Sequence, residues 1–235
     1  MRISAVVPVY AETEALRRVV AGLVEAADRW LYEVLIVLAP PAPDETRRIC
    51  ARLAGDLAQV RVLEQARFPG LGWAVRQGIN EAKGSHILLV DGDGEMDTAT
   101  VPDLVRALQA TGADLAVASR WMAGGRVIGY PRAKYPLTLG FQYAFRPFYR
   151  TRIHDLSLGY KLGRAEVLQK IAWRGRFHEI ACETTLRPLH LGYQVVEVPT
   201  VWRRRGAGSS SNPFRRNFRY VAMAIWILLE QRPRR

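Results

Sequence analysis

The sequence of 235 residues predicts an α/β fold in which helices flank a mostly parallel sheet. Short apolar runs alternate with amphipathic stretches through the first half of the chain, which is the pattern of strand–helix units. The apolar runs are nearly continuous in Val, Ile and Leu, and this indicates strands that are buried on both faces. Ligands of such sheets bind at the carboxyl ends of the strands, so we expect the functional residues there.

The expected elements follow one another as strand and helix. Strands are expected at 3–9, 32–38, 60–63, 86–90 and 114–118, and helices at 12–28, 44–53, 71–82 and 101–110. After Ser119 the pattern is less regular. The glycines Gly124, Gly125 and Gly129 indicate a loop of the kind that closes over a ligand, and a further helix is expected at 137–148.

The C-terminal segment carries most of the net charge. Residues 201–235 contain nine Arg and one Glu, which is +8 of the total +12 and indicates a partner with phosphates or anionic lipid. We expect one domain at 1–212 and a basic amphipathic helix with a tail at 213–235. The apolar part, residues 220–229, would be about 15 Å long as a helix and could not span a hydrocarbon core of about 30 Å. It either lies at a membrane surface or packs on the domain or on a partner protein.

The N-terminus has a short apolar run without a small-residue cleavage site, so no signal peptide is expected. The predicted location is the cytoplasm, peripheral at the cytoplasmic face of the membrane. Cys50 and Cys182 lie far apart and are expected to be buried, without a disulfide or a zinc site.

Three acids follow the buried strand at 86–90. Asp91, Asp93 and Glu95 alternate with glycines, and in an extended chain residues two apart point the same way, so the three carboxylates could converge on one cation. Clustered carboxylates without histidine suit Mg²⁺ or Mn²⁺. A calcium loop would need an acid at the twelfth position, where Pro102 stands.

These features resemble family 2 glycosyltransferases, and among them the chain is similar to dolichyl- and polyprenyl-phosphate mannose synthases. Three segments resemble the donor side of the family: Val7-Pro8-Val9-Tyr10-Ala11-Glu12 its nucleotide-binding first strand, Gly70-Leu71-Gly72 its glycine-rich helix start, and Asp91-Gly92-Asp93-Gly94-Glu95 its metal motif. Ser119-Arg120-Trp121 with Lys134 resembles its acceptor-side loop. Two further segments also match, Asp155-Leu156-Ser157-Leu158-Gly159-Tyr160-Lys161 and Glu197-Val198-Pro199 with Arg205 and Ser210. The resemblance covers nearly the whole chain.

The resemblance implies a Rossmann-like glycosyltransferase A fold and an enzyme that transfers a hexose, mannose or glucose, with inversion. The implied donor is a GDP- or UDP-linked sugar, and the implied acceptor is a lipid phosphate. The implied site comprises Pro8, Tyr10, Glu12, Gly70, Gly72, Asp91 and Gly92 for the nucleotide sugar, Ser119, Asp155 and Ser210 on the acceptor side, Asp91, Asp93 and Glu95 for the metal, and Asp93, Arg120, Lys134 and Arg205 for catalysis. The last three would hold the acceptor phosphate. A membrane surface or a membrane protein is a further expected partner.

The chain departs from the family pattern after its second strand. The chain reads Val37-Leu38-Ala39-Pro40-Pro41 there, with Leu38 and Ala39 in place of the usual paired aspartates, and Ser211 replaces a usual lysine. A non-catalytic relative is therefore one alternative. A second is a transferase that acts on a hydroxyl of a polysaccharide or small molecule, which would need Asp155 or Glu183 as a base. A third, nucleic-acid binding, is suggested by the pI of 10.3, but the acids at 91–95 would repel a phosphate backbone, so nucleic acid is not an expected partner.

Overall fold

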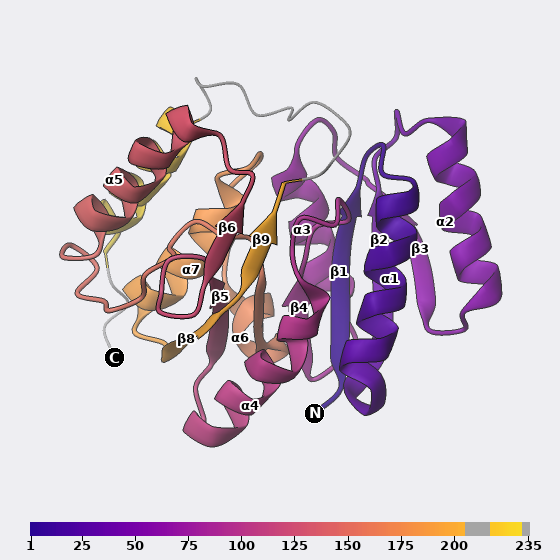
Figure 1. The fold of residues 1–235 in the computed structure, drawn as a ribbon, viewed down its shortest axis with the longest axis horizontal. Helices are drawn as coiled ribbons and strands as arrows, with labels where there is room; N and C mark the ends of the chain where they lie inside the picture. Colours follow the sequence, from indigo (N-terminus) through magenta and orange to yellow (C-terminus); the bar gives the residue numbers. More distant parts are fainter. Residues whose placement is uncertain (205–216, 232–235) are drawn as a thin grey trace.

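The computed structural model describes residues 1–204 and 217–231, and these form a seven-stranded sheet between two layers of helices (Figure 1). The sheet has the order β3-β2-β1-β4-β7-β5-β8, and β6 and β9 form a separate two-stranded sheet. The strands are β1 (Ile3–Val9), β2 (Leu31–Leu38), β3 (Val60–Glu64), β4 (His86–Leu89), β5 (Leu115–Ser119), β6 (Arg126–Ile128), β7 (Lys161–Arg164), β8 (Val195–Pro199) and β9 (Val201–Arg203). The α-helices are α1 (Glu14–Ala27), α2 (Asp44–Asp56), α3 (Leu71–Glu81), α4 (Val101–Thr111), α5 (Tyr135–Phe145), α6 (Ala165–Lys170), α7 (Ile180–Leu191) and α8 (Asn217–Leu229).

The parallel half of the sheet confirms the expected fold class. β1 pairs in parallel with β2 and β4, and β2 pairs in parallel with β3. Every residue of β1 is buried, as the continuous Val, Ile and Leu run predicts for a strand covered on both faces. The carboxyl ends of β1, β2 and β4 therefore lie along one edge, where the loops that follow them meet.

One strand runs against the others. β7 lies between β4 and β5 and is antiparallel to both. The loop that precedes β7 therefore reaches the same sheet edge as the loops that follow β4 and β5. Residues 153–160 are thereby placed beside the acid motif and beside Arg120.

Two apolar clusters fill the space on the two faces of the sheet. Side chains of α1, α2 and α4 pack on one face with alternate residues of β1 and β2, and those of α3, α6 and α7 pack on the other. The second cluster continues outward into α5 and α8, where the Tyr149 hydroxyl donates to the carbonyl of Ala224 at 2.8 Å. In Figure 1, α5 and α8 lie at the opposite end of the sheet from α2.

The C-terminal helix begins at Asn217 and packs along one side only. Ala224 and Ile227 are fully buried against the domain, while Phe218, Ile225 and Leu229 are 67%, 46% and 78% exposed. Within the part of the chain that the structure describes, no helix is long and apolar enough to cross a bilayer. The domain boundary expected at 212 and 213 lies outside the described residues.

Candidate active site

A cavity of about 1660 Å³ opens at the carboxyl ends of β1 and β4. This is larger than the usual ligand cavity of about 300–1,000 Å³ and leaves room for two substrates. Its lining includes these residues expected from the sequence: Pro8, Tyr10, Glu12, Gly70, Asp91, Gly92, Asp93, Glu95, Arg120 and Lys134. The structure therefore brings together side chains that are up to 126 positions apart in the sequence, from Pro8 to Lys134.

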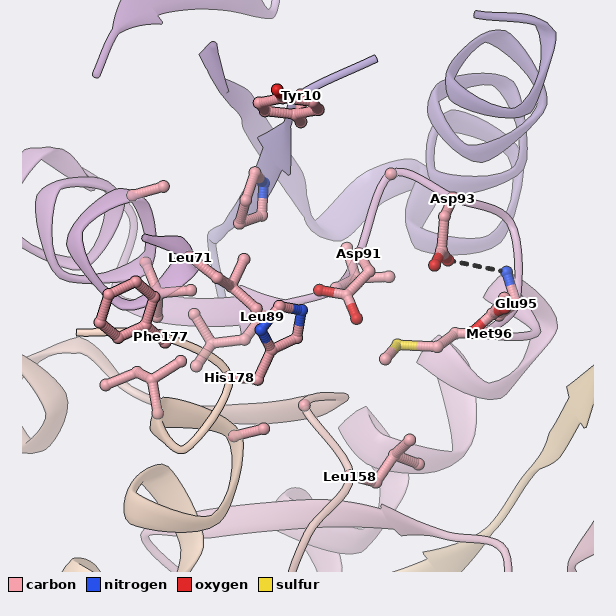
Figure 2. A pocket seen from close by; sticks show the side chains of 18 of the residues that line it. Tyr10, Leu71, Leu89, Asp91, Asp93, Glu95, Met96, Leu158, Phe177 and His178 are labelled. Atoms are coloured by element: carbon pink, nitrogen blue, oxygen red, sulfur yellow. Dashed lines mark hydrogen bonds between the residues drawn. The ribbon is translucent and has the colours of Figure 1, made fainter. Parts of the chain in front are cut away.

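The acid motif forms a turn at the end of β4, and this corrects the expected convergence of three carboxylates. Figure 2 shows Asp91 directed into the cavity, whereas the Asp93 carboxylate lies beside its own loop and accepts a hydrogen bond from the Glu95 amide at 3.0 Å. Among the described residues, no group of three Asp, Glu, His or Cys side chains is arranged to hold a metal ion. The alternation of a strand does not apply, because β4 ends at Leu89 and Gly94 has a φ of +73°.

The loop after β1 forms the next wall of the cavity. The Glu12 carboxylate turns back and accepts hydrogen bonds from the amides of Tyr10 at 2.6 Å and Ala11 at 3.0 Å. Glu12 thus shapes the loop that presents the Tyr10 ring, which is 53% exposed. Pro8 is buried on β1 directly below this loop.

The glycines at the start of α3 serve close packing. A Cβ on Gly72 would lie 2.2 Å from the carbonyl oxygen of Gly175, and one on Gly70 would lie 2.0 Å from that of Arg176. Gly70 borders the cavity, but Gly72 is buried against the loop that precedes α7 and does not line it. Gly72 therefore positions the wall of the cavity, which differs from the expected contact with a nucleotide sugar.

A buried ion pair joins β5 to the loop before β7. Arg120 donates from Nε to Asp155 at 2.7 Å and from a terminal nitrogen at 3.0 Å, and the two side chains are 8% and 0% exposed. Burial by itself would raise the pKa of Asp155, but the adjacent guanidinium and several hydrogen bonds outweigh it and hold that pKa below its usual value. Asp155 is therefore ionised at neutral pH and fixes Arg120 at the cavity wall.

The two carboxylates expected as possible bases are both engaged. The oxygens of Asp155 accept hydrogen bonds from Arg120, from Ser157 and from the amide of Leu158. Glu183 is fully buried and accepts hydrogen bonds from the amides of Arg174 and Gly175 and from Arg187. Neither residue lines the cavity, so the structure does not support either of them as a general base.

Ser119 also differs from its expected position on the acceptor side. Its side chain is fully buried, and its hydroxyl accepts hydrogen bonds from the amides of Trp121 and Met122 at 3.3 and 3.2 Å. A serine hydroxyl commonly binds the backbone two or three residues further on in a turn. Ser119 thus stabilises the turn after Arg120 instead of facing the cavity.

Basic side chains of several elements line the cavity. Lys134 lies in a short turn before α5, and Arg203 and Arg204 follow from β9, whose backbone reaches the acid loop through a hydrogen bond from the Arg203 amide to the Glu95 carbonyl at 2.8 Å. The sequence did not predict a place in the cavity for these two arginines. Arg205 and Ser210, also expected here, lie outside the described residues.

Lys161, the last residue of the segment 155–161, lies buried next to residues that line the cavity. Lys161 is fully buried, and its ammonium donates to the carbonyl of Ala181 and to the hydroxyls of Thr184 and Thr185 at 2.6–2.9 Å. Burial lowers its pKa to about 7. Because Ala181 and Thr184 themselves line the cavity, Lys161 ties α7 to the strand beside the acid loop.

Other residues of the cavity gave no signal in the sequence. Phe177 and His178 precede α7, and Figure 2 shows both facing the same space as Asp91. Phe141 of α5 and Tyr220 of α8 close the far side, with ring centroids 6.2 Å apart. Phe141 and Tyr220 are 79 positions apart in the sequence, so only the fold reveals that they lie close together.

Comparison with known proteins identifies the family. Residues 4–172, more than two thirds of the chain, match the family described as Glycosyl transferase family 2. The chain belongs to this family. A polyprenol monophosphomannose synthase of Mycolicibacterium smegmatis is 32% identical over 87% of the chain and 78% of its own length. An undecaprenyl-phosphate mannosyltransferase of Micrococcus luteus is 28% identical over 89% of the chain and 87% of its own length.

A solved structure supports the same fold. Glucosyl-3-phosphoglycerate synthase from Mycobacterium tuberculosis, crystallised with Mn²⁺, UDP and phosphoglyceric acid, superposes with a TM-score of 0.74 at 16% identity, over 99% of the chain and 80% of that protein. The family 2 chain thus has the glycosyltransferase A fold and is a nucleotide-sugar-dependent glycosyltransferase, as its sequence predicted.

Proposed function

We propose that the chain transfers a hexose, mannose or glucose, from a GDP- or UDP-linked sugar to a polyprenyl or dolichyl phosphate, with inversion at the anomeric carbon. The observation that carries this proposal is the pairing of charges in the cavity. A carboxylate, Asp91, is directed into it from the loop after β4, and three basic side chains, Arg120, Lys134 and Arg204, line the same cavity. The names of the two mannose-transferring relatives support the acceptor class.

The donor diphosphate would need a divalent cation, Mg²⁺ or Mn²⁺, and the acid motif suits one. Asp91 offers hard oxygen ligands to the cavity, with Asp93 next to it on the same turn. Mg²⁺ is usually held by one or two carboxylates together with substrate phosphates and water, so the absence of a three-acid group among the described residues agrees with such a site. When bound, the cation would supply positive charge against the departing nucleoside diphosphate.

The chain's own residues would act mainly on the acceptor. Arg120, fixed by Asp155, and Lys134 would hold the acceptor phosphate beside the anomeric carbon by charge-assisted hydrogen bonds. A phosphate oxygen then forms the new bond to the sugar as the bond to the donor diphosphate breaks. Phosphate monoesters have a second pKa near 6 and attack as anions at neutral pH, so no base is required. The two possible bases, Asp155 and Glu183, already accept hydrogen bonds from other groups of the protein, which favours this acceptor over a hydroxyl.

We expect the purified chain to convert GDP-mannose or UDP-glucose and polyprenyl phosphate into a glycolipid when Mg²⁺ or Mn²⁺ is present. The measurement is labelled product formed from each donor, with polyprenyl phosphate and with phosphoglyceric acid or a glycan as the acceptor. Product on a hydroxyl acceptor alone would support the alternative transferase. Donor binding without transfer to any acceptor would support a non-catalytic relative.

A lipid acceptor also requires access to a membrane, and the outer faces of α5 and α8 offer it. Leu137 and Phe141 of α5 and Phe218 and Val221 of α8 border the cavity. Beyond them, Tyr143 and Phe148 are 67% and 66% exposed near α5, and Leu229 is 78% exposed on α8. These exposed apolar side chains, with Arg150 and Arg219 beside them, suit the interface of an anionic membrane, and the chain would act there from the cytoplasmic side.

The triple variant Phe148→Ser, Ile225→Ser and Leu229→Ser, whose three positions are exposed and do not line the cavity, should bind vesicles of anionic phospholipid about 100-fold more weakly. The reason is the lost transfer of three apolar side chains, each worth about 1 kcal/mol here because an interface buries only part of a side chain whose full burial is worth roughly 1.5–3 kcal/mol. Sedimentation with vesicles measures the change, and Tyr32→Ser, which removes an exposed aromatic ring at a distant strand, is the matched control. Unchanged sedimentation of the triple variant would contradict the assignment of this face. Transfer to a short, soluble polyprenyl phosphate should persist.

A further inference from the structure

A second cavity, of about 520 Å³, lies between α8 and the loop that precedes α7, and we call it the α8 groove. Its volume falls in the usual range of ligand sites, about 300–1,000 Å³. Its lining combines apolar side chains of α8 with three arginines: Ala222, Met223, Trp226, Arg174, Arg176 and Arg219. The proposed sugar transfer uses none of these residues as a contact to the donor or to the acceptor phosphate.

Two of the arginines are stacked on aromatic rings. The Arg174 guanidinium lies 4.3 Å from the centre of the Trp226 ring, and that of Arg219 lies 4.1 Å from the centre of the Phe177 ring. A guanidinium that stacks through its flat face keeps its N–H edge available, and this edge binds phosphate oxygens two at a time. Stacking therefore orders both side chains for an anion before the anion arrives.

The groove carries an excess of positive charge. Arg174 pairs with Glu230 at 3.5 Å, but within residues 1–204 and 217–231 neither Arg176 nor Arg219 forms an ion pair with an acidic side chain. Glu179 also lines the groove, and one of its oxygens accepts hydrogen bonds from the amides that follow Gly175 and Arg176, at 3.0 Å each. Two unpaired guanidiniums against one carboxylate leave one positive charge, which matches the charge of a phosphate diester.

The groove also borders the exposed apolar face of α8. Phe218, Ile225 and Leu229 are 67%, 46% and 78% exposed, and Ala222, which lines the groove, lies between them at helical spacing. A phosphate held by the arginines would therefore lie beside a surface that suits acyl chains. A soluble phosphate ester would leave this surface uncovered, whereas a phospholipid would cover it.

We propose that the α8 groove binds a phospholipid with one net negative charge, its phosphate on Arg176 and Arg219 and an acyl chain along Met223 and Trp226. The inference goes beyond the proposed function, because this lipid is neither the donor nor the acceptor. Phe177 lines both the groove and the active-site cavity. A phospholipid in the groove would therefore hold this wall of the active site at the membrane surface.

The test is titration of the full chain with a short-chain phosphatidylglycerol that carries bromine on its acyl chains, kept below the concentration at which it forms micelles. Bromine quenches the emission of a tryptophan that it contacts, so we expect saturable quenching. The chain has six tryptophans, and Trp226→Phe, which keeps a ring beneath Arg174, should remove the quenching and so assign it to the groove.

Three further variants test the charges. Arg219→Gln should weaken binding about 5-fold, the effect of one basic side chain on an anionic lipid. Glu179→Gln should tighten binding by up to about 5-fold, because Gln keeps the oxygen that binds the two amides but removes the negative charge. Arg48→Gln, an exposed arginine of α2 outside the groove, should leave the affinity unchanged. Phosphatidylcholine with the same chains has no net charge and should bind at least about 5-fold more weakly.

Several results would overturn the proposal. Quenching that is absent, or that persists in Trp226→Phe, would exclude a lipid in this groove. Equal affinity for phosphatidylglycerol and phosphatidylcholine would contradict the charge match. Glycerol phosphate that competes as tightly as the lipid would make a soluble ester the ligand. Each of these results leaves the labelled-product assay of the proposed function unaffected, so the two can fail separately.

Discussion

Replacing Asp91 by Asn should lower the rate of sugar transfer by about 10³-fold, equivalent to about 4 kcal/mol of transition-state stabilisation. Figure 2 shows the Asp91 carboxylate directed into the cavity. An Asn side chain keeps the shape of this carboxylate but carries no negative charge. Turnover at saturating donor and acceptor measures the effect, repeated over increasing Mn²⁺ because a weakened cation site should need more metal.

The matched control for this change is Asp97→Asn. Asp97 lies six residues further on, where its carboxylate accepts a hydrogen bond from the Ala99 amide at the start of a short helical turn, and it does not line the cavity. Asn caps the start of a helix as well as Asp does, so the variant should keep both its folding and its turnover. If Asp91→Asn kept more than a third of the activity of the control, Asp91 would have no role in transfer.

Replacing Asp155 by Ala should destabilise the protein by about 3–5 kcal/mol, because it leaves the Arg120 guanidinium buried without its partner. Urea unfolding measures this loss. The control is Asp103→Ala, which breaks an exposed pair with Arg106 and should cost no more than about 1 kcal/mol. A loss below 1 kcal/mol for Asp155→Ala would contradict the buried ion pair.

The same pair gives stability a defined pH dependence. The folded-state pKa of Asp155 lies below the ordinary value of 3.8, so its contribution is fully present above that value and is lost as the pH falls through the folded pKa. The difference in stability between the wild type and Asp155→Ala should therefore shrink in acid.

The double variant Arg120→Met with Asp155→Leu should recover stability, since apolar replacements of a buried pair are often tolerated, but it should not recover transfer.

The first half of the fold was predictable because its strands are mostly apolar and alternate with amphipathic helices. Val, Ile and Leu make up four of the seven residues of β1, six of the eight of β2 and three of the four of β4. β7 was missed because its four residues, Lys161–Arg164, include two charged side chains and a glycine. Its place in the centre of the sheet depends on pairing with strands far away in the sequence, which periodicity does not report.

The site was predictable where a motif lies within one loop and unpredictable where partners come from different loops. The sequence predicts that Asp91 and Tyr10 lie at the site, because each comes just after the end of an apolar strand. The pairing of Arg120 with Asp155 joins residues 35 positions apart, and it changes Asp155 from an expected acceptor contact into a buried support. The arrangement of Asp91, Asp93 and Glu95 was misjudged because the motif was treated as extended chain, whereas the glycines form a turn.

The antiparallel position of β7 also determines the order in which the sheet can be completed during synthesis. β4 and β5 are made before residue 120, but neither can pair on its inner side until Lys161–Arg164 has left the ribosome. Until then, the growing chain carries two unpaired strand edges in what becomes the middle of the protein, and such edges can pair with other chains. The gap between β4 and β5 thus closes late, with only β8 still to be added at the outer edge of β5, and a nascent chain that stalls before residue 161 would be prone to aggregate.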